Sequence, residues 1–207
     1  NRAGTDTGNY HGIQLAAGAD NAVIGGSAYG QGNVLGWSDS YDMYYLASGG
    51  TQTVKGNFFV VTYDVSWRDL NPSNHGIYVD GAGALTIGGS HTGTWAAPAR
   101  TRINEGNFMA AYDNAGLAAI YVNDGSPIIK GNYIGTDRLG QFFGNVYGIY
   151  MAAGADGVTI GGTGYGEGNV IGANTSYDIY YLSTSASATT IRGNFIGTTY
   201  DAGTWFD

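Results

Sequence analysis

The chain has 207 residues, of which 37 are Gly and 17 are Tyr, and its formal net charge is -8 with only 12% charged residues. Such scarce Lys and Arg exclude a nucleic-acid partner, and a hydrophobic content of 43% excludes a disordered chain. Gly without a period of three excludes collagen, the absence of Cys excludes disulfides, and no apolar run has the length of a membrane span. The composition is typical of secreted, extracellular surface proteins.

A long internal repeat organises the chain. Residues 16–46 read AAGADNAVIGGSAYGQGNVLGWSDSYDMYYL, and residues 152–182 read AAGADGVTIGGTGYGEGNVIGANTSYDIYYL. Self-similarity of this length predicts a solenoid, in which one structural unit is stacked several times. We therefore expect a single domain over 1–207, with repeats at about 9–72, 73–144 and 145–207.

Short apolar segments with a period of two recur along the chain, and a Gly-Asn pair follows each of them. Their length and alternation predict β-strands, and the glycines permit positive φ at corners. The turns are long and short in alternation, so the fold class we predict is all-β: a single parallel β-helix (β-solenoid) of about six coils in three two-coil repeats, roughly 30 Å tall. The segments are Ile13/Leu15, Met43/Tyr45, Ile77/Val79, Ile120/Val122, Ile149/Met151 and Ile179/Tyr181.

The pleat of the strands predicts which side chains fill the core. The predicted core comprises Ile13, Leu15, Val23, Ile24, Val34, Val54, Ile77, Val79, Ile87, Ile120, Val122, Ile129, Ile149, Ile160, Val170, Ile179 and Ile191. The asparagines of the Gly-Asn pairs would stack as a structural ladder, because their amides can bond turn groups and one another. These residues are Asn33, Asn57, Asn107, Asn132, Asn169 and Asn194.

The segments IGGTGYGEGNVIG at 160–172 and IRGNFIGT at 191–198 resemble the parallel β-helix repeats of large secreted bacterial surface proteins. The resemblance covers nearly the whole chain, except for HTGTWAAPARTR at 91–102 and VTYD at 61–64. It implies right-handed coils and an extracellular setting. It implies no activity, because the same solenoid serves adhesins, surface layers and polysaccharide lyases.

Neither end of the predicted column is plainly capped, and the residues before the Gly-Asn pairs alternate in charge: Gln31, Lys55, Glu105, Lys130, Glu167 and Arg192. Opposite charges on neighbouring strands attract, so this order favours further coils at either end. Either the chain was cut from a longer array, or copies stack head to tail. We favour a homopolymer, a structural fibre or surface array. Its predicted end-to-end interface is Ile13, Leu15, Ile24, Gln31, Val34, Ile179, Tyr181, Ile191, Arg192 and Phe195.

The alternative is an adhesin or carbohydrate-binding segment of a larger surface protein. Alternation directs Tyr44 and Tyr180 outward, where they could contact a glycan or partner together with Trp95, or form an aromatic ladder that stabilises the sheet. Asn174 begins the sequon Asn174-Thr175-Ser176, a candidate glycosylation site.

A polysaccharide lyase or glycoside hydrolase is less favoured, and we predict no enzyme. Acidic residues such as Asp20 and Asp156 are repeat equivalents, which indicates turn chemistry rather than a catalytic pair. His11 and His75 share a repeat position, but the second coil separates them, which disfavours a metal site. We predict no cofactor, and the spacing of Gly and Asp supports bound Ca²⁺ only weakly. The best non-repeated cluster would be Trp95, Arg100, Arg102 and Glu105.

Overall fold

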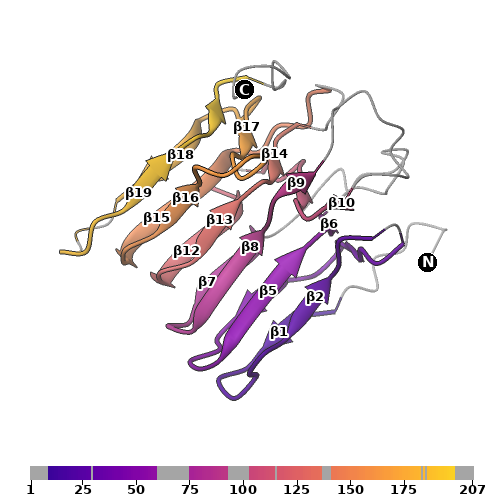
Figure 1. Cartoon of the computed structure of the whole chain (residues 1–207), viewed down its shortest axis with the longest axis vertical. Helices are drawn as coiled ribbons and strands as arrows, with labels where there is room; N and C mark the ends of the chain where they lie inside the picture. Colours follow the sequence, from indigo (N-terminus) through magenta and orange to yellow (C-terminus); the bar gives the residue numbers. More distant parts are fainter. Residues whose placement is uncertain are drawn as a thin grey trace.

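The computed structural model describes residues 9–28, 30–59, 75–92, 103–114, 116–136, 141–182, 184 and 186–198, without the side chains of 91–92 and 103–104. All regular elements in these ranges are β-strands, and eighteen of the strands form three parallel sheets of six strands. Each coil contributes one strand to each sheet, so the six coils build a column (Figure 1). The predicted parallel β-helix of about six coils is confirmed.

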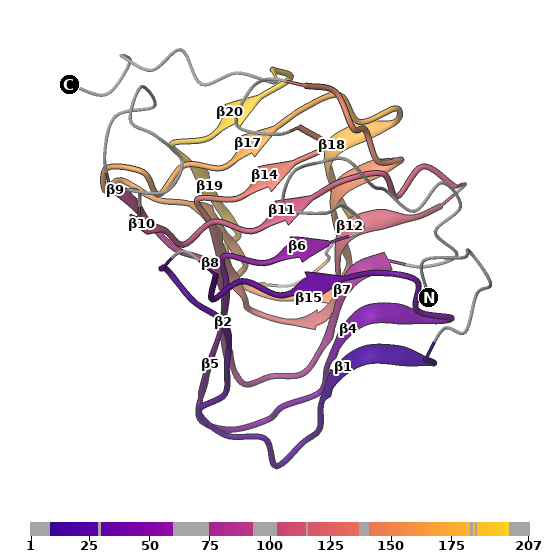
Figure 2. The same ribbon diagram turned by 90° about the vertical axis from the view of Figure 1, so that its right-hand side faces the viewer.

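The three sheets form three sides of the column, with an apolar core between them (Figure 2). The first sheet holds β1 (His11–Leu15), β4 (Tyr41–Tyr45), β7 (His75–Asp80), β12 (Ala118–Gly125), β15 (Tyr147–Ala155) and β18 (Tyr177–Tyr181). The second sheet holds β2 (Val23–Gly25), β5 (Thr51–Lys55), β8 (Ala84–Gly88), β13 (Ile128–Lys130), β16 (Thr159–Gly161) and β19 (Thr190–Arg192). The third sheet holds β3 (Val34–Leu35), β6 (Phe58–Phe59), β11 (Phe108–Met109), β14 (Tyr133–Ile134), β17 (Val170–Ile171) and β20 (Phe195–Ile196).

One departure from this plan lies between β8 and β11 in the third coil. There the strands β9 (His91–Thr92) and β10 (Ile103–Asn104) pair in antiparallel fashion. The hairpin flanks the segment 93–102, which lies outside the described residues.

Equivalent residues of successive coils are in register. Ile77 aligns with Ile120, and Ile120 aligns with Ile149. Because side chains alternate along a strand, this register brings like residues onto the same face in every coil. The core is therefore a set of vertical columns of aliphatic side chains, which are fully buried in the middle coils.

The structure corrects part of the predicted core. Leu35 and Ile171 point into the main core, so their neighbours Val34 and Val170 lie on the outer face of the third sheet. Val34 is exposed there, as Val23 is on the second sheet, so the prediction that these residues fill the core is wrong. Strands of two or three residues contain too little alternation to show which side chain points inward.

Val170 is buried in a second, smaller apolar cluster outside the third sheet. This cluster comprises Phe108, Ala110, Tyr133 and Val170, with Phe58, Phe143 and Phe195 packed against it. The remaining correction is Ile191, which is exposed because it belongs to the last coil described.

Glycine is required where the second sheet turns toward the third. Gly88 and Gly161 end their strands with φ of +90° and +83°. A Cβ at Gly88 would collide with the carbonyl oxygen of Lys130 in the next coil, and a Cβ at Gly161 would collide with that of Arg192. The Ile-Gly-Gly motif of the long turns thus permits both the backbone conformation and the close approach of the coils.

No helix occurs in the part of the chain that the structure describes, so no helical segment there could span a membrane.

Candidate functional site

The six asparagines of the Gly-Asn pairs form one continuous hydrogen-bonded ladder through all six coils. In each of the first five asparagines, the backbone N–H and the side-chain Nδ2 both donate to Oδ1 of the asparagine in the next coil, at 2.8–3.0 Å. From the second coil onward, Nδ2 also donates to a carbonyl oxygen at 2.7–3.0 Å in the second sheet of the preceding coil. The ladder binds each corner to the coils before and after it. Its members are Asn33, Asn57, Asn107, Asn132, Asn169 and Asn194.

The ladder has a direction, and its two ends are complementary. Among the described residues, nothing donates to Oδ1 of Asn33. At the other end, Nδ2 of Asn194 donates to the carbonyls of Ile160 and Arg192, but the described residues offer it no ladder acceptor. One end therefore presents an acceptor, and the other presents the matching donors.

A column of charged side chains runs beside the ladder. Lys55 Nζ lies 2.7 Å from Glu105 Oε1, and Lys130 Nζ lies 2.9 Å from Glu167 Oε1. The second carboxylate oxygen of Glu167 accepts the N–H of Gly164 at 2.9 Å. The second carboxylate oxygen of Glu105 accepts the N–H of Ser90 at 3.2 Å. Each glutamate thus bonds to the backbone of its own long turn and also pairs with the lysine of a neighbouring coil.

The charge column lowers the pKa of both of its glutamates. The hydrogen bond from Lys55 is the largest cause that lowers the pKa of Glu105, and that from Lys130 is the largest for Glu167. The charge of Lys130 also lowers the pKa of Glu105, and that of Arg192 lowers the pKa of Glu167. Gln31 occupies the acidic position in the first coil, where its Oε1 accepts the N–H of Ala28 at 3.0 Å.

The last described coil leaves core positions open. Tyr181, Ile191 and Ile196 are 47%, 46% and 49% exposed, whereas the residues below them in the fifth coil are fully buried. In the first coil Leu15 and Leu35 are buried, and Ile13 and Ile24 are partly buried against the core.

Two residues predicted for the end-to-end interface do not point into the core. Val34 and Phe195 align with the outer column of that sheet, so neither faces along the axis from the core. Ile196, which the sequence analysis did not select, occupies the inward position of the last coil, just as Leu35 does in the first. Ile179, at the first-sheet side, is partly buried against the core.

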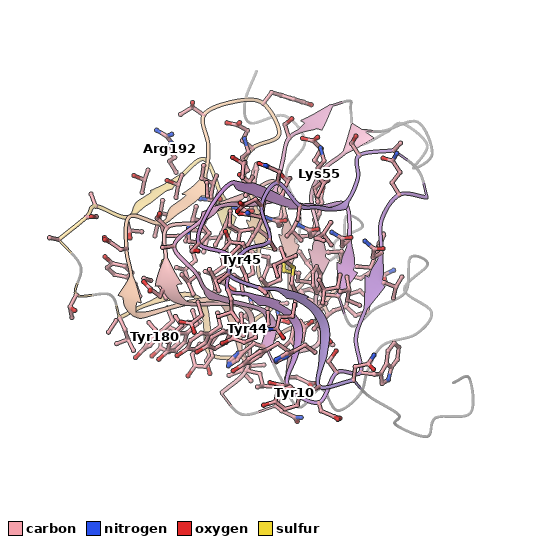
Figure 3. The ribbon with its side chains drawn as sticks, turned by 90° about the horizontal axis from the view of Figure 1, so that it is seen from below. Tyr10, Tyr44, Tyr45, Lys55, Tyr180 and Arg192 are labelled. Atoms are coloured by element: carbon pink, nitrogen blue, oxygen red, sulfur yellow. The ribbon has the colours of Figure 1, made fainter. Side chains whose placement is uncertain are left out.

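The outer face of the first sheet carries two adjoining columns of rings, which we call the aromatic face. Tyr78 and Tyr121 stack with centroids 5.0 Å apart and an interplanar angle of 5°, and Tyr121 and Tyr150 stack at 4.7 Å and 8°. Tyr44 and Tyr180 lie on this side of the column, Tyr45 lies inside, and Lys55 and Arg192 lie away from it (Figure 3). The face comprises His11, Tyr41, Tyr44, His75, Tyr78, Tyr121, Tyr147, Tyr150, Tyr177 and Tyr180.

Stacking determines what the aromatic face presents to solvent. Because the ring faces in the middle coils cover one another, the exposed parts are ring edges and hydroxyl groups. Burial is the largest cause that raises the pKa of Tyr78 and Tyr121, so these phenols are neutral at physiological pH. Asp80 borders the face, where it accepts hydrogen bonds from Tyr44 Oη at 3.4 Å and Asn123 Nδ2 at 2.8 Å.

The two histidines of the face serve as packing groups. Nδ1 of His75 accepts the N–H of Ala118 at 2.9 Å, and burial lowers the pKa of His75 to about 4. The ring of Tyr41 stacks between His11 and His75. The described residues contain no group of three or more His, Cys, Asp or Glu that could hold a metal ion.

Asn174, the candidate glycosylation site, belongs to a second amide chain at the corner between the third and first sheets. Asn145 donates through its N–H and Nδ2 to Asn174 Oδ1 at 3.1 and 2.7 Å, and Asn174 Nδ2 donates to Asp178 Oδ1 at 2.7 Å. This chain was not predicted, although Gly144-Asn145 is a further Gly-Asn pair of the sequence. Glycosylation stays a prediction at an amide nitrogen that already has a structural partner.

Of the remaining candidates, Trp95, Arg100 and Arg102 lie outside the described residues. Glu105, the fourth member of that cluster, is engaged by Lys55.

The fold and its ladders define the class of protein, a parallel β-solenoid. Comparison of the chain with protein-family models, curated proteins and solved structures finds no match.

Proposed function

We propose that the protein is an extracellular structural unit that stacks head to tail into a fibre or surface array. The complementarity of the ladder ends carries this proposal. With the last coil of one copy placed on the first coil of the next, the N–H and Nδ2 of Asn194 reach Oδ1 of Asn33. The junction then repeats the pair of hydrogen bonds found between all consecutive coils, each contributing about 0.5–1.5 kcal/mol.

The core columns support the same arrangement. By register, Tyr181, Ile191 and Ile196 continue the columns that begin with Leu15, Ile24 and Leu35 of the next copy. Each of the three upper side chains is about half exposed, so covering it contributes roughly 1 kcal/mol. Such an interface joins two different surfaces and does not close on itself, so it leads to an open filament.

The charge column identifies the weakest point of the junction. Arg192 of one copy would stack on Gln31 of the next, whereas within the chain lysines pair with glutamates. Substitution Gln31→Glu should therefore lower the concentration at which fibres form, and Gln31→Lys should raise it. Phe142→Ser is the matched control, because Phe142 is an exposed apolar residue away from both terminal coils.

Electron microscopy and sedimentation over a range of protein concentrations test the proposal. The expected result is unbranched fibres with an axial repeat of about 29 Å, six strand spacings. The two Gln31 variants should shift the onset of assembly in opposite directions, and Phe142→Ser should leave it unchanged. Monomeric particles at every concentration, for the wild type and for Gln31→Glu alike, would contradict it.

A second candidate function, adhesion or carbohydrate binding, is favoured by the aromatic face. Its half-buried tyrosines offer ring edges and hydroxyl groups at intervals of about one strand spacing, ~4.8 Å, which suits an extended neutral glycan. Affinity electrophoresis in neutral β-linked polysaccharides tests it. Tyr150→Ala should abolish retardation and Tyr165→Ala, an exposed tyrosine outside the face, should not. We propose no enzymatic activity, since Glu105 and Glu167 are held in ion pairs.

A further inference from the structure

Several tyrosines of the aromatic face have rings in direct contact with the ring of the next coil. The ring centroids of Tyr41 and Tyr78 are 4.3 Å apart, those of Tyr121 and Tyr150 are 4.7 Å apart, and those of Tyr78 and Tyr121 are 5.0 Å apart. Two phenyl rings joined directly by a carbon–carbon bond have their centroids at a similar separation. A bond between ortho carbons of two such rings therefore requires a change in ring orientation but little change in the distance between the rings.

We propose that the aromatic face is a site of oxidative modification, in which neighbouring tyrosines couple to dityrosine and link adjacent coils covalently. The oxidant is hydrogen peroxide acting through a peroxidase. Each of two phenols gives up one electron and its phenolic proton, which leaves radicals with spin density on the ortho carbons. The radicals join in one carbon–carbon bond, and the two ortho hydrogens move to the oxygens and restore both phenols. In sum, two hydrogen atoms leave the protein and one hydrogen peroxide becomes two water molecules.

The arrangement of the rings favours coupling within one molecule. Each radical already has a second phenol in contact, so the step gains the high effective concentration of an oriented intramolecular reaction. Ring contacts run without a break from Tyr41 through Tyr78, Tyr121 and Tyr150 to Tyr180, so an oxidised ring anywhere on the face has a neighbour to couple with. The rings are partly exposed, so the peroxidase can oxidise phenols of the face from solvent.

Coupling requires both exposure to solvent and contact with another tyrosine ring, and two tyrosines outside the aromatic face each lack one of these conditions. Tyr45 is fully buried, and its hydroxyl donates to Gln52 Oε1 at 2.7 Å. Tyr165 is exposed, but makes no ring contact with the described residues. Exposure without a neighbour and burial without access should both prevent intramolecular coupling. The inference therefore depends on the aromatic face alone, and it holds whether or not copies stack end to end.

Treatment of dilute protein with peroxidase and hydrogen peroxide tests the inference. The expected products keep the monomer mass less two hydrogens per link and show dityrosine fluorescence. Trypsin separates Tyr78, the only tyrosine of peptide 69–100, from Tyr121 in peptide 103–130. The other tyrosine of peptide 103–130, Tyr112, is buried and donates its hydroxyl to Asp42. A conjugate of these two peptides that requires Tyr121 therefore reports the link between the third and fourth coils.

Variants that keep the ring and remove the phenol sharpen the test. Tyr121→Phe should abolish the conjugate of peptides 69–100 and 103–130, whereas Tyr165→Phe should leave its yield unchanged. Oxidation in concentrated urea should also abolish it, because the register between coils is lost. Cross-links only between molecules, or a conjugate that survives in Tyr121→Phe or in urea, would overturn the inference.

Discussion

Replacing Asn132 by alanine removes the middle of the asparagine ladder. The Asn132 side chain is fully buried, and its Oδ1 accepts the N–H and Nδ2 of Asn107, both at 3.0 Å. Its Nδ2 donates to the carbonyl of Ile87 at 2.9 Å. The substitution Asn132→Ala therefore takes a partner from the buried N–H of Asn107 and from the buried carbonyl of Ile87. Each such loss costs about 1–3 kcal/mol, so the free energy of unfolding should fall by about 2–6 kcal/mol.

Asn194→Ala is the matched control, since Asn194 makes the equivalent contacts in the last described coil. It accepts from Asn169 at 3.0 and 2.8 Å and donates to Ile160 at 2.9 Å, but it is only half-buried. Water can replace these bonds, so the expected cost is about 1 kcal/mol. The assay is urea unfolding followed by circular dichroism at a protein concentration where the wild type is monomeric. If the two variants lost the same unfolding free energy to within about 0.5 kcal/mol, the ladder would not stabilise the fold by satisfying buried hydrogen-bonding groups.

Three further predictions concern pH and backbone geometry. The pKa of His75 is about 4 in the folded state, below its ordinary 6.5, so the unfolded state binds the proton first as the pH falls. The free energy of unfolding should therefore decrease from pH 6.5 to pH 4. Urea titrations over that range should show a less steep decrease for His75→Gln. Glu167→Gln should lower the free energy of unfolding by at most about 1 kcal/mol at pH 7, because the ion pair with Lys130 is partly exposed. Since the pKa of Glu167 is lowered, the difference in unfolding free energy between variant and wild type should disappear in acid, below that pKa. Gly88→Ala should lower the free energy of unfolding by about 2 kcal/mol or more, because the new Cβ would strain the backbone and collide with Lys130. Gly30 has φ of +81° but open space around it, so Gly30→Ala should lower the free energy of unfolding by only about 1 kcal/mol in the same assay.

The fold was predictable because residues that mark the corners of the coils recur along the sequence. Every coil carries one Gly-Asn pair that belongs to the ladder, and the ladder needs an amide at that corner each time, so the spacing of residues such as Asn132 and Asn169 indicates the coils. The inward positions of the first and second sheets followed from alternation. In the third sheet a two-residue strand such as Val34–Leu35 has no alternation to read, and both residues are apolar. Only the position of the neighbouring coils decides between them.

The aromatic face was predictable only in part. Tyr44 and Tyr180 were selected because a Tyr-Tyr pair stands near the end of both copies of the long repeat, at 16–46 and 152–182. The stacked tyrosines between them follow an inward isoleucine in the same way, as in Ile120-Tyr121 and Ile149-Tyr150, and that signal was present. Their parallel stacking could not be inferred, because ring orientation depends on the packing of two columns against each other.

The asparagine ladder and the charge column differ in period, so a shift of one coil at the proposed junction would preserve the ladder but change the charge pairing. The ladder repeats in every coil, so Asn194 would be satisfied equally by Asn33 or, if the first coil were frayed, by Asn57 of another copy. The charges repeat only every second coil, so docking on the second coil would place Arg192 against Lys55. Like charges on neighbouring strands repel. In the proposed fibre, the charge column would therefore disfavour docking on the second coil, which the ladder alone would allow.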